Sequence, residues 1–191
     1  MKRVIVGITG ASGVIYGIRT VEELKARGCE VHLVLTKNAV KVMHEETSAT
    51  PEYLENLVDS VYSNSDLTAP IASGSFKADG MVIVPCSMAT LSEIAYGISR
   101  SLISRAALVT LKENRKLVLV PRETPLTSIH LLNMLKLSRA GAVILPAMPA
   151  FYIKPETVND LVNFVVGKIL DQLGIKHELY RRYRDFEERK R

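Results

Sequence analysis

Five short apolar runs, separated by stretches with helical periodicity, are the feature that most constrains how this chain folds. The runs have the length of buried strands and lie at Arg3–Ile8, Glu30–Leu35, Gly80–Val84, Lys116–Val120 and Ala142–Leu145. Continuous apolar runs are typical of parallel strands, because helices cover both faces of a parallel sheet. Strands that alternate with helices are joined by crossover connections. The sequence therefore predicts a doubly wound α/β fold, a three-layer sandwich with one parallel sheet between two layers of helices.

Glycine marks the end of three predicted helices. Apolar residues recur at helical spacing in Val14–Arg27, Thr127–Arg139 and Thr157–Leu173, and a glycine lies one or two residues beyond each of them. A glycine just past a helix closes it readily, because glycine adopts the left-handed conformation at little cost. The last of these helices carries a broad apolar face that starts at Val158.

The composition is compatible with one domain spanning residues 1–191. Of the 191 residues 47% are hydrophobic and 24% are charged, enough for a sizeable core, and no apolar run approaches a membrane span. The two cysteines, Cys29 and Cys86, have neither metal nor redox spacing, which favours a cytoplasmic location. Much of the net charge of +5 lies in a basic tail from about residue 175, which we expect to be a solvated helix. No stripe of basic and aromatic residues indicates nucleic acid.

The loops that follow the predicted strands carry the chemically informative residues. Ligands of open parallel sheets bind beyond the carboxyl ends of the strands. The loops there read TGASG, LTKNA, PCSMAT and PRETP, and PAMPAFY follows the last strand. We expect these five loops to meet along one edge of the sheet.

The glycine-rich turn GITGASG indicates an anion site. Gly10, Ser12 and Gly13 lie where the first strand passes into a helix, and a helix N-terminus attracts phosphate. The spacing is not that of a dinucleotide turn, and the second strand is followed by Thr36 and Lys37 rather than by a carboxylate for a ribose. A mononucleotide phosphate is therefore favoured over NAD. The alternative is a plain strand-to-helix turn in which Ser12 caps the helix.

The remaining loops leave structural and functional interpretations open. Cys86 has no accompanying histidine pattern, so we interpret it as a small residue lining a pocket rather than as a nucleophile. Arg122 and Glu123 lie between two prolines and form either a rim of an active site or a surface ion pair. Lys168, on a polar helix face, is consistent with simple solvation.

Taken in order, these motifs resemble those of the flavin prenyltransferase family, formerly described as flavoprotein phenylacrylate or polyprenyl-hydroxybenzoate decarboxylases. The likeness runs nearly end to end, through GITGASG, PCSMAT, LKENRKLVLVPRETP, TSIHLLNML and PAFY. The resemblance implies a flavodoxin-like (Rossmann-type) fold that binds reduced FMN and dimethylallyl monophosphate. It implies transfer of the dimethylallyl group to nitrogen 5 and carbon 6 of the flavin without a metal, with loss of phosphate. The prenylated FMN product would serve a partner decarboxylase, including one in ubiquinone biosynthesis, and the family assembles as a homo-dodecamer.

The resemblance also implies roles for individual residues. The cofactor-binding set would be Gly10, Ala11, Ser12, Thr36, Ser87, Met88, Ala89, Thr90 and Arg122, of which Arg122 would reach in from a neighbouring subunit to contact FMN. The prenyl phosphate would be bound by Tyr152, Lys168 and Lys112. Glu46 and Glu123 match carboxylates that move protons, so that the catalytic set would be Glu46, Glu123 and Lys112.

Two residues depart from the pattern of relatives, and two other functions remain open. Lys168 stands where several relatives have arginine, and Tyr183 where some have tryptophan. Lysine keeps the charge but lacks the bidentate fork of arginine, so donor affinity is less securely predicted than the reaction.

One alternative function is that of an FMN-dependent cysteine decarboxylase of the same fold, although the catalytic histidine and clamping segment of those enzymes are not found. The other is a nucleotide-binding module without catalysis.

Overall fold

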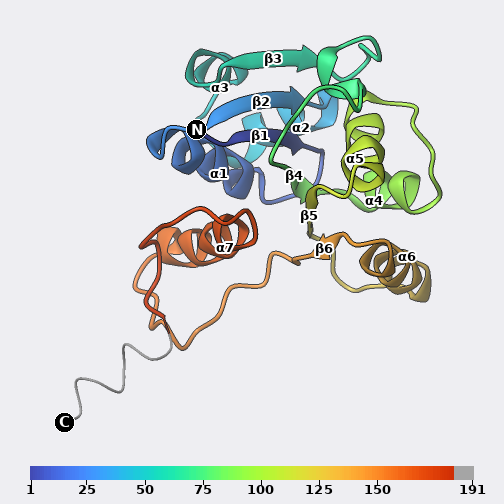
Figure 1. Ribbon diagram of the computed structural model, residues 1–191. Helices are drawn as coiled ribbons and strands as arrows, with labels where there is room; N and C mark the ends of the chain where they lie inside the picture. The colour runs from blue at the N-terminus through green and yellow to red at the C-terminus, as the bar shows by residue number, and fades with distance from the viewer. Residues whose placement is uncertain (183–191) are drawn as a thin grey trace.

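A computed structural model describes residues 1–182 and has the predicted parallel sheet at its centre (Figure 1). The strands pair in the order β3-β2-β1-β4-β5-β6, and every pairing is parallel. Their bounds are β1 Arg3–Ile8, β2 Glu30–Leu35, β3 Ser60–Ser63, β4 Gly80–Cys86, β5 Lys116–Pro121 and β6 Val143–Ile144. The doubly wound α/β architecture is confirmed.

The differences from the predicted strands lie toward the sheet edges and at the site. The edge strand β3 was not predicted, because its four residues, SVYS, contain no apolar run and alternate between half-buried and exposed. The other edge strand, β6, has only two of the four expected residues. The central strand β4 extends through Cys86, beyond the predicted end at Val84, with an irregularity in its pairing to β5.

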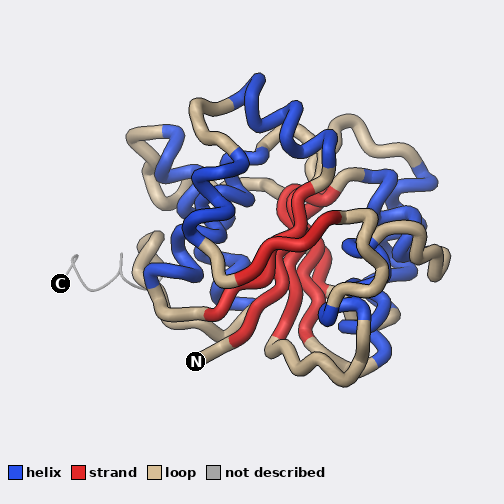
Figure 2. Tube along the Cα trace, turned by 90° about the horizontal axis from the view of Figure 1, so that it is seen from above, coloured by secondary structure: helices blue, strands red, loops and turns tan. Residues whose placement is uncertain are grey.

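Helices cover both faces of the sheet, as the view from above shows (Figure 2). Their bounds are α1 Val14–Ala26, α2 Lys37–Glu46, α3 Pro51–Leu57, α4 Met88–Ala95, α5 Leu102–Lys112, α6 Ser128–Arg139 and α7 Val158–Gln172, with a 3-10 turn at Pro70–Ala72. Glycine follows α1, α6 and α7 with a positive φ, as predicted: Gly28, Gly141 and Gly174. Thr127 and Thr157 cap α6 and α7, and the predicted apolar face of α7 is buried except near its start, where Val158 is exposed.

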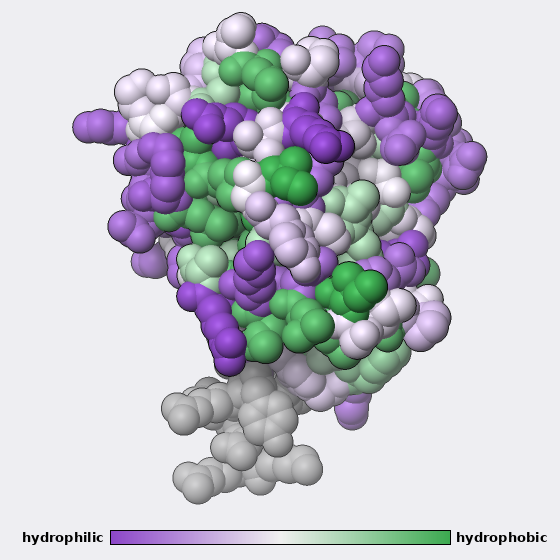
Figure 3. Space-filling model, turned by 90° about the vertical axis from the view of Figure 1, so that its right-hand side faces the viewer, coloured by the Kyte–Doolittle hydropathy of each residue, from purple (hydrophilic) through white to green (hydrophobic). Residues whose placement is uncertain are grey.

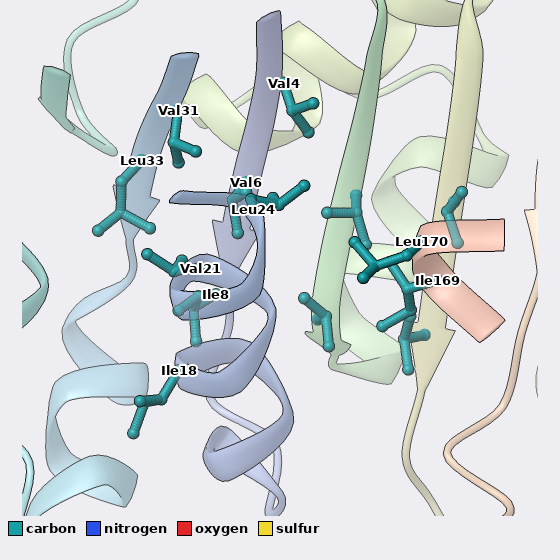
Figure 4. Packing of buried hydrophobic residues seen from close by; sticks show 14 of the residues in the cluster. Val4, Val6, Ile8, Ile18, Val21, Leu24, Val31, Leu33, Ile169 and Leu170 are labelled. Carbon is teal, nitrogen blue, oxygen red and sulfur yellow. The ribbon is translucent and has the colours of Figure 1, made fainter. Parts of the chain in front are cut away.

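The core consists of two clusters, one on each face of the sheet. Figure 4 shows part of the first, in which side chains of β1 and β2 pack against α1, while Ile169 and Leu170 of α7 lie over the neighbouring strands β4 and β5. The second lies between the opposite face and helices α4, α5 and α6. Gly17 lets α1 approach the sheet closely, because a Cβ at this position would lie 2.5 Å from the carbonyl oxygen of Val84.

The described part of the basic tail is not helical, contrary to expectation. Residues 175–182 form no helix and follow α7 back along its surface. Hydrogen bonds from this segment to Asp171, rather than a continued helical ladder, hold it in place. Tyr183, singled out above, lies outside the described residues. No helix within residues 1–182 is long and apolar enough to cross a membrane.

Replacing Gly17 with alanine should destabilise the protein. Alanine favours a helix over glycine by about 1 kcal/mol, whereas overpacking against a fixed backbone atom costs about 1–3 kcal/mol. We expect Gly17→Ala to lower the free energy of unfolding in a denaturant titration. Lys41→Ala, on the exposed surface of α2, is the control and should change it by less than about 0.5 kcal/mol. An unchanged stability of Gly17→Ala would show that α1 can move away from β4.

Candidate functional site

The ends of β1 and β4 are joined by one buried threonine, Thr9. Its hydroxyl donates a hydrogen bond to the carbonyl oxygen of Pro85 (2.8 Å) and accepts one from the N–H of Ser87 (2.8 Å). The residue is only 1% exposed, so water does not compete for these bonds. Thr9 thereby holds the TGASG and PCSMAT loops together at the carboxyl edge of the sheet. The predicted site residues did not include it, because one threonine in a glycine-rich turn carries no distinctive pattern.

The N-terminus of α1 is occupied by a carboxylate of the protein itself. Glu46, the last residue of α2, accepts hydrogen bonds from the N–H groups of Gly13 (2.8 Å) and Val14 (3.2 Å). Gly13, with φ of 98°, is the capping residue, and no side chain of its own caps the helix. The alternative in which Ser12 caps α1 is therefore wrong. The carboxylate of Glu46 thus fills the helix N-terminus at which we expected a phosphate. The helix dipole stabilises its negative charge there.

A second helix begins beside this turn. A Cβ on Gly10 would lie 2.4 Å from the Cβ of Asn38, so only glycine lets the turn approach the first residues of α2 so closely. The hydroxyl of Thr36 caps α2 by accepting a hydrogen bond from the N–H of Ala39 (3.0 Å). Ala11 is buried, whereas Ser12 is exposed. Gly10 and Thr36, placed together by sequence reasoning, do lie on adjoining segments.

The PCSMAT segment divides between β4 and α4 rather than forming a separate turn. Ser87 caps α4, and its hydroxyl interacts with both the N–H and the hydroxyl of Thr90 (3.3 and 3.1 Å). Met88 and Ala89 complete the first turn of the helix beside them. Cys86 is fully buried, and its burial raises the pKa of the thiol. It is therefore not the pocket-lining residue that we expected, and a neutral buried thiol is a poor nucleophile.

The PRETP loop borders a cleft of about 460 Å³. Its Arg122 donates a hydrogen bond from Nε to the carbonyl oxygen of Ser12 (3.1 Å), which joins the loop after β5 to the loop after β1 within one chain. Glu123 is exposed, and its carboxylate accepts a hydrogen bond from the N–H of Thr124 (3.1 Å). The cleft combines Arg122 and Glu123 with apolar side chains, including Met134 and Met148. We call the residues at this edge the strand-edge site: Gly10, Ala11, Ser12, Thr36, Glu46, Ser87, Met88, Ala89, Thr90, Arg122 and Glu123.

Tyr152 and Lys168 lie together in a different place, which we call the α7 cluster: Tyr152, Phe164, Lys168 and Tyr180. The ring of Tyr152 meets Phe164 edge-on with centres 5.9 Å apart, and Phe164 lies 5.0 Å from Tyr180. The ammonium of Lys168 lies 5.6 Å from the ring centre of Tyr180. Lys168 is about 15 Å along α7 from its first residue. A larger cleft of about 720 Å³ opens beside Tyr180, between residues 153–160 and 177–182.

Lys112 lies at the opposite edge of the sheet. It closes α5, four residues before β5 begins at Lys116, and its ammonium is paired with Glu113. A strand of six residues is about 17–20 Å long, so β5 separates Lys112 from the strand-edge site. Within one chain, therefore, Lys112 and the α7 cluster both lie apart from the strand-edge site. Among residues 1–182 no group of three or more His, Cys, Asp or Glu side chains could hold a metal ion.

Comparison with known proteins finds similar chains over nearly the whole length of this one. A family model described as Flavoprotein matches residues 1–170. The flavin prenyltransferase UbiX of Halalkalibacterium halodurans is 54% identical over 188 residues, which cover 93% of this chain and 91% of that protein.

Solved structures show the same fold over nearly the whole chain. AnUbiX (PadA1) in complex with FMN and dimethylallyl pyrophosphate superposes with a TM-score of 0.94 at 47% identity, covering 95% of this chain and 97% of that one. A dodecameric FMN-dependent UbiX-like decarboxylase from Escherichia coli O157:H7 has a TM-score of 0.92 at 48% identity, with 95% and 98% covered. A peptidyl-cysteine decarboxylase, at 17% identity and a TM-score of 0.64, shares the fold alone.

Thr9→Val tests the junction between the first two loops. Valine keeps the shape but leaves the N–H of Ser87 without its buried acceptor, which costs about 1–3 kcal/mol of unfolding free energy. Thr110→Val is the matched control, because that buried hydroxyl bonds the carbonyl of Ala106 one turn back in its own helix. Denaturant titration of both variants should show the larger loss for Thr9→Val. Equal losses would mean that Thr9 is an ordinary buried hydroxyl.

Proposed function

This chain belongs to the flavin prenyltransferase family, and we propose that it joins the dimethylallyl group of dimethylallyl phosphate to reduced FMN, releasing phosphate. The proposal is carried by the strand-edge cleft, which Arg122 and Glu123 line and where Arg122 bonds the β1–α1 turn, in a chain 54% identical to a flavin prenyltransferase. Anaerobic incubation with reduced FMN and dimethylallyl phosphate tests it. The product mass should equal FMN with one five-carbon unit added. Unmodified FMN would contradict the proposal.

The strand-edge site fits a flavin mononucleotide. A cleft lined by methionine side chains and prolines suits a flat apolar ring, and Arg122 is a cation at its border. Because Glu46 occupies the N-terminus of α1, we assign the phosphate to Gly10, Ala11, Ser12 and Thr36, next to the first turn of α2. Ser87 to Thr90 would hydrogen-bond the ring from the α4 side.

The α7 cluster and Lys112 would bind the prenyl phosphate. Cleavage of the allylic C–O bond leaves its electron pair, and hence negative charge, on the departing phosphate. The ammonium groups of Lys168 and Lys112 and the phenol of Tyr152 would stabilise that charge, the task that a metal ion performs in other enzymes. Reduced FMN supplies the electron-rich nitrogen 5 and carbon 6 to which the five-carbon unit becomes attached.

Two carboxylates would move the protons. Attachment at carbon 6 removes one proton from the ring and adds one to the double bond of the five-carbon unit, while the proton lost from nitrogen 5 leaves with the phosphate. Glu123, exposed on a loop between two prolines, would accept the ring proton and exchange protons with the phosphate. Glu46 lies beside the same turn, where two backbone N–H groups hold its carboxylate in a fixed orientation. We assign to Glu46 the role of orienting the reacting part of the flavin and the proton on nitrogen 5.

The separation of these residues within one chain favours a site completed between subunits. The outer face of α6 exposes four large apolar side chains, Ile129, Leu131, Leu132 and Leu135, at 64%, 53%, 64% and 47%. The face of the molecule that carries α6 shows apolar patches in its lower part (Figure 3). Patches of this kind mark association surfaces. We assign this one to self-association, up to the dodecamer of the Escherichia coli relative. Metal independence, a partner decarboxylase that uses the product and a cytoplasmic location stay predictions.

Glu123→Gln should stop proton transfer while leaving the flavin bound. The amide keeps the size and hydrogen-bonding reach of the side chain but accepts no proton, so we expect product formation to fall at least about a hundredfold. The FMN dissociation constant, measured by titration, should stay within about twofold. Glu55→Gln, on the exposed side of α3, is the control. A rate within a few-fold of the parent would remove Glu123 from the catalytic set.

Lys168→Ala should weaken the prenyl phosphate selectively. Loss of an ammonium from a phosphate site should weaken dimethylallyl phosphate binding about 10- to 100-fold, equivalent to about 1.4–2.8 kcal/mol. Lys168→Arg should restore most of the affinity, since guanidinium suits phosphate. Calorimetric titrations with FMN alone, and then with dimethylallyl phosphate added to the FMN complex, measure both. Lys77→Ala is the control, and equal loss of FMN would make Lys168 structural.

Mixed oligomers of Lys112→Ala and Glu123→Gln test whether different subunits build one site. Each homogeneous variant should be nearly inactive. If the two residues of a site come from different chains, about one quarter of the sites in an equal random mixture regain both wild-type residues. If they come from the same chain, none does. Co-expression with two affinity tags, followed by tandem purification, gives the mixed oligomer, and inactivity of that species would contradict an intersubunit site.

A further inference from the structure

The segment after α7 returns along the helix and is anchored to it through the carboxylate of Asp171. The hydroxyl of Tyr180 donates to Oδ2 of Asp171 (2.5 Å), while Nε2 of His177 and an Nη of Arg182 lie 3.2 and 2.9 Å from Oδ1. The His177 side chain is only 1% exposed. Arg27, at the end of α1, donates to the carbonyl oxygen of Lys176 (3.0 Å) at the start of the segment. These bonds hold residues 175–182 against α7 and the end of α1.

Gly167 provides the flat surface on which Tyr180 rests. A Cβ at Gly167 would lie 2.6 Å from Cδ1 of Tyr180 and 2.8 Å from Cε1 of His177. The φ of Gly167 is helical, so the backbone does not require glycine there. The reason for glycine is the close approach of the two rings, which places Tyr180 directly beside Lys168.

The ring of Tyr180 contacts Lys168 directly and is linked to Tyr152 through Phe164. Lys168 lies 5.6 Å from its centre, within the range of a cation–π contact. Phe164 lies 5.0 Å away on the other side and in turn packs against Tyr152. A lysine on an exposed helix face otherwise samples many rotamers, and binding a phosphate would have to order it.

The hydrogen bond that holds the ring is one between a phenol and a carboxylate. Burial and the bond to Asp171 raise the pKa of Tyr180, so it stays protonated. Burial tends to raise the pKa of Asp171, but its hydrogen bonds with Tyr180 and Arg182 outweigh this and lower it, so it stays ionised. A bond to an ionised acceptor is stronger than one between neutral groups.

We propose that Tyr180 is a positioning residue for the prenyl-phosphate donor: held by Asp171 and seated on Gly167, it orients Lys168 and Tyr152 before the donor binds. This inference rests on the proposed function, because it assigns Tyr180 to the donor side of that reaction. It separates Tyr180 from the catalytic set, since the residue acts through Lys168 and Tyr152 rather than on the reacting atoms.

Three substitutions separate positioning from simple folding. Tyr180→Leu removes the aromatic face but keeps apolar volume, and should raise the KM for dimethylallyl phosphate about fivefold with little change in kcat. Tyr180→Phe keeps the face but loses the hydrogen bond to Asp171, and should raise the KM by an intermediate amount, about two- to threefold. Gly167→Ala displaces the ring and should resemble Tyr180→Leu. Tyr53→Leu is the matched control, because Tyr53 also bonds a carboxylate, Glu22 (2.8 Å), but lies on α3.

A double-mutant cycle with Lys168→Ala gives the decisive measurement. Calorimetric titration of dimethylallyl phosphate into the FMN complex gives the dissociation constant of the donor. In the Lys168→Ala background, Tyr180→Leu should raise this constant by less than about twofold, because the effects of substituting two interacting residues are not additive. FMN affinity and the melting temperature should match those of Tyr53→Leu. Fully additive losses, or equal loss of FMN, would overturn the inference. If wild-type protein forms product and Lys168→Ala weakens the donor while Tyr180→Leu does not, this inference fails and the proposed function stands. If wild-type protein forms no prenylated FMN, both fail.

Discussion

The parallel pairing of β1 with β2 on one side and β4 on the other is the constraint on which the rest of the structure depends. The chain leaves β1 in one direction to build β2 and β3, and later returns to the other side to build β4, β5 and β6. The loops after β1 and β4 therefore diverge, and a crevice opens where the winding reverses. At that point the hydroxyl of Thr9 makes two buried hydrogen bonds to Pro85 and Ser87. These bonds keep the first residues of the two loops together.

This topology also explains why one chain holds only part of the proposed site. Parallel strands end at one edge, so the residues that follow them, such as Thr36 and Arg122, gather there. Residues at the ends of the crossover helices lie at the other edge, where Lys112 is found. The end of α7 lies at that edge too, because Lys2, just before β1, donates a hydrogen bond to the carbonyl oxygen of Leu173. Lys168 therefore lies most of the way along α7 toward that edge. A reaction that needs all four residues at one place requires several copies of the chain, and the exposed apolar face of α6 provides a means of association.

Much of the fold could be predicted because its signals are local. The central strands are continuous apolar runs, and Gly28, Gly141 and Gly174 close their helices with positive φ values. The strand β3 could not be predicted, since a short edge strand needs no apolar run and forms through its pairing with β2. The strand-edge site was predictable in outline from loops after strands. The carboxylate of Glu46 at Gly13, by contrast, depends on a contact between residues 33 positions apart. The return of residues 175–182 along α7 depends in the same way on contacts with Asp171 rather than on local helical preference.

The position of Glu46 bears on how the strand-edge site distinguishes its ligands. A carboxylate that already accepts the N–H groups of Gly13 and Val14 repels a second anion at the same place, so this helix N-terminus is closed to phosphate while Glu46 stays there. The neighbouring N-terminus of α2 is capped by the neutral hydroxyl of Thr36, which does not repel phosphate. Two adjoining helix ends thus differ in charge because one cap is an acid and the other an alcohol. We therefore expect a mononucleotide to bind with its phosphate toward α2, which would leave Glu46 free of the phosphate, beside the turn where the proposed chemistry takes place.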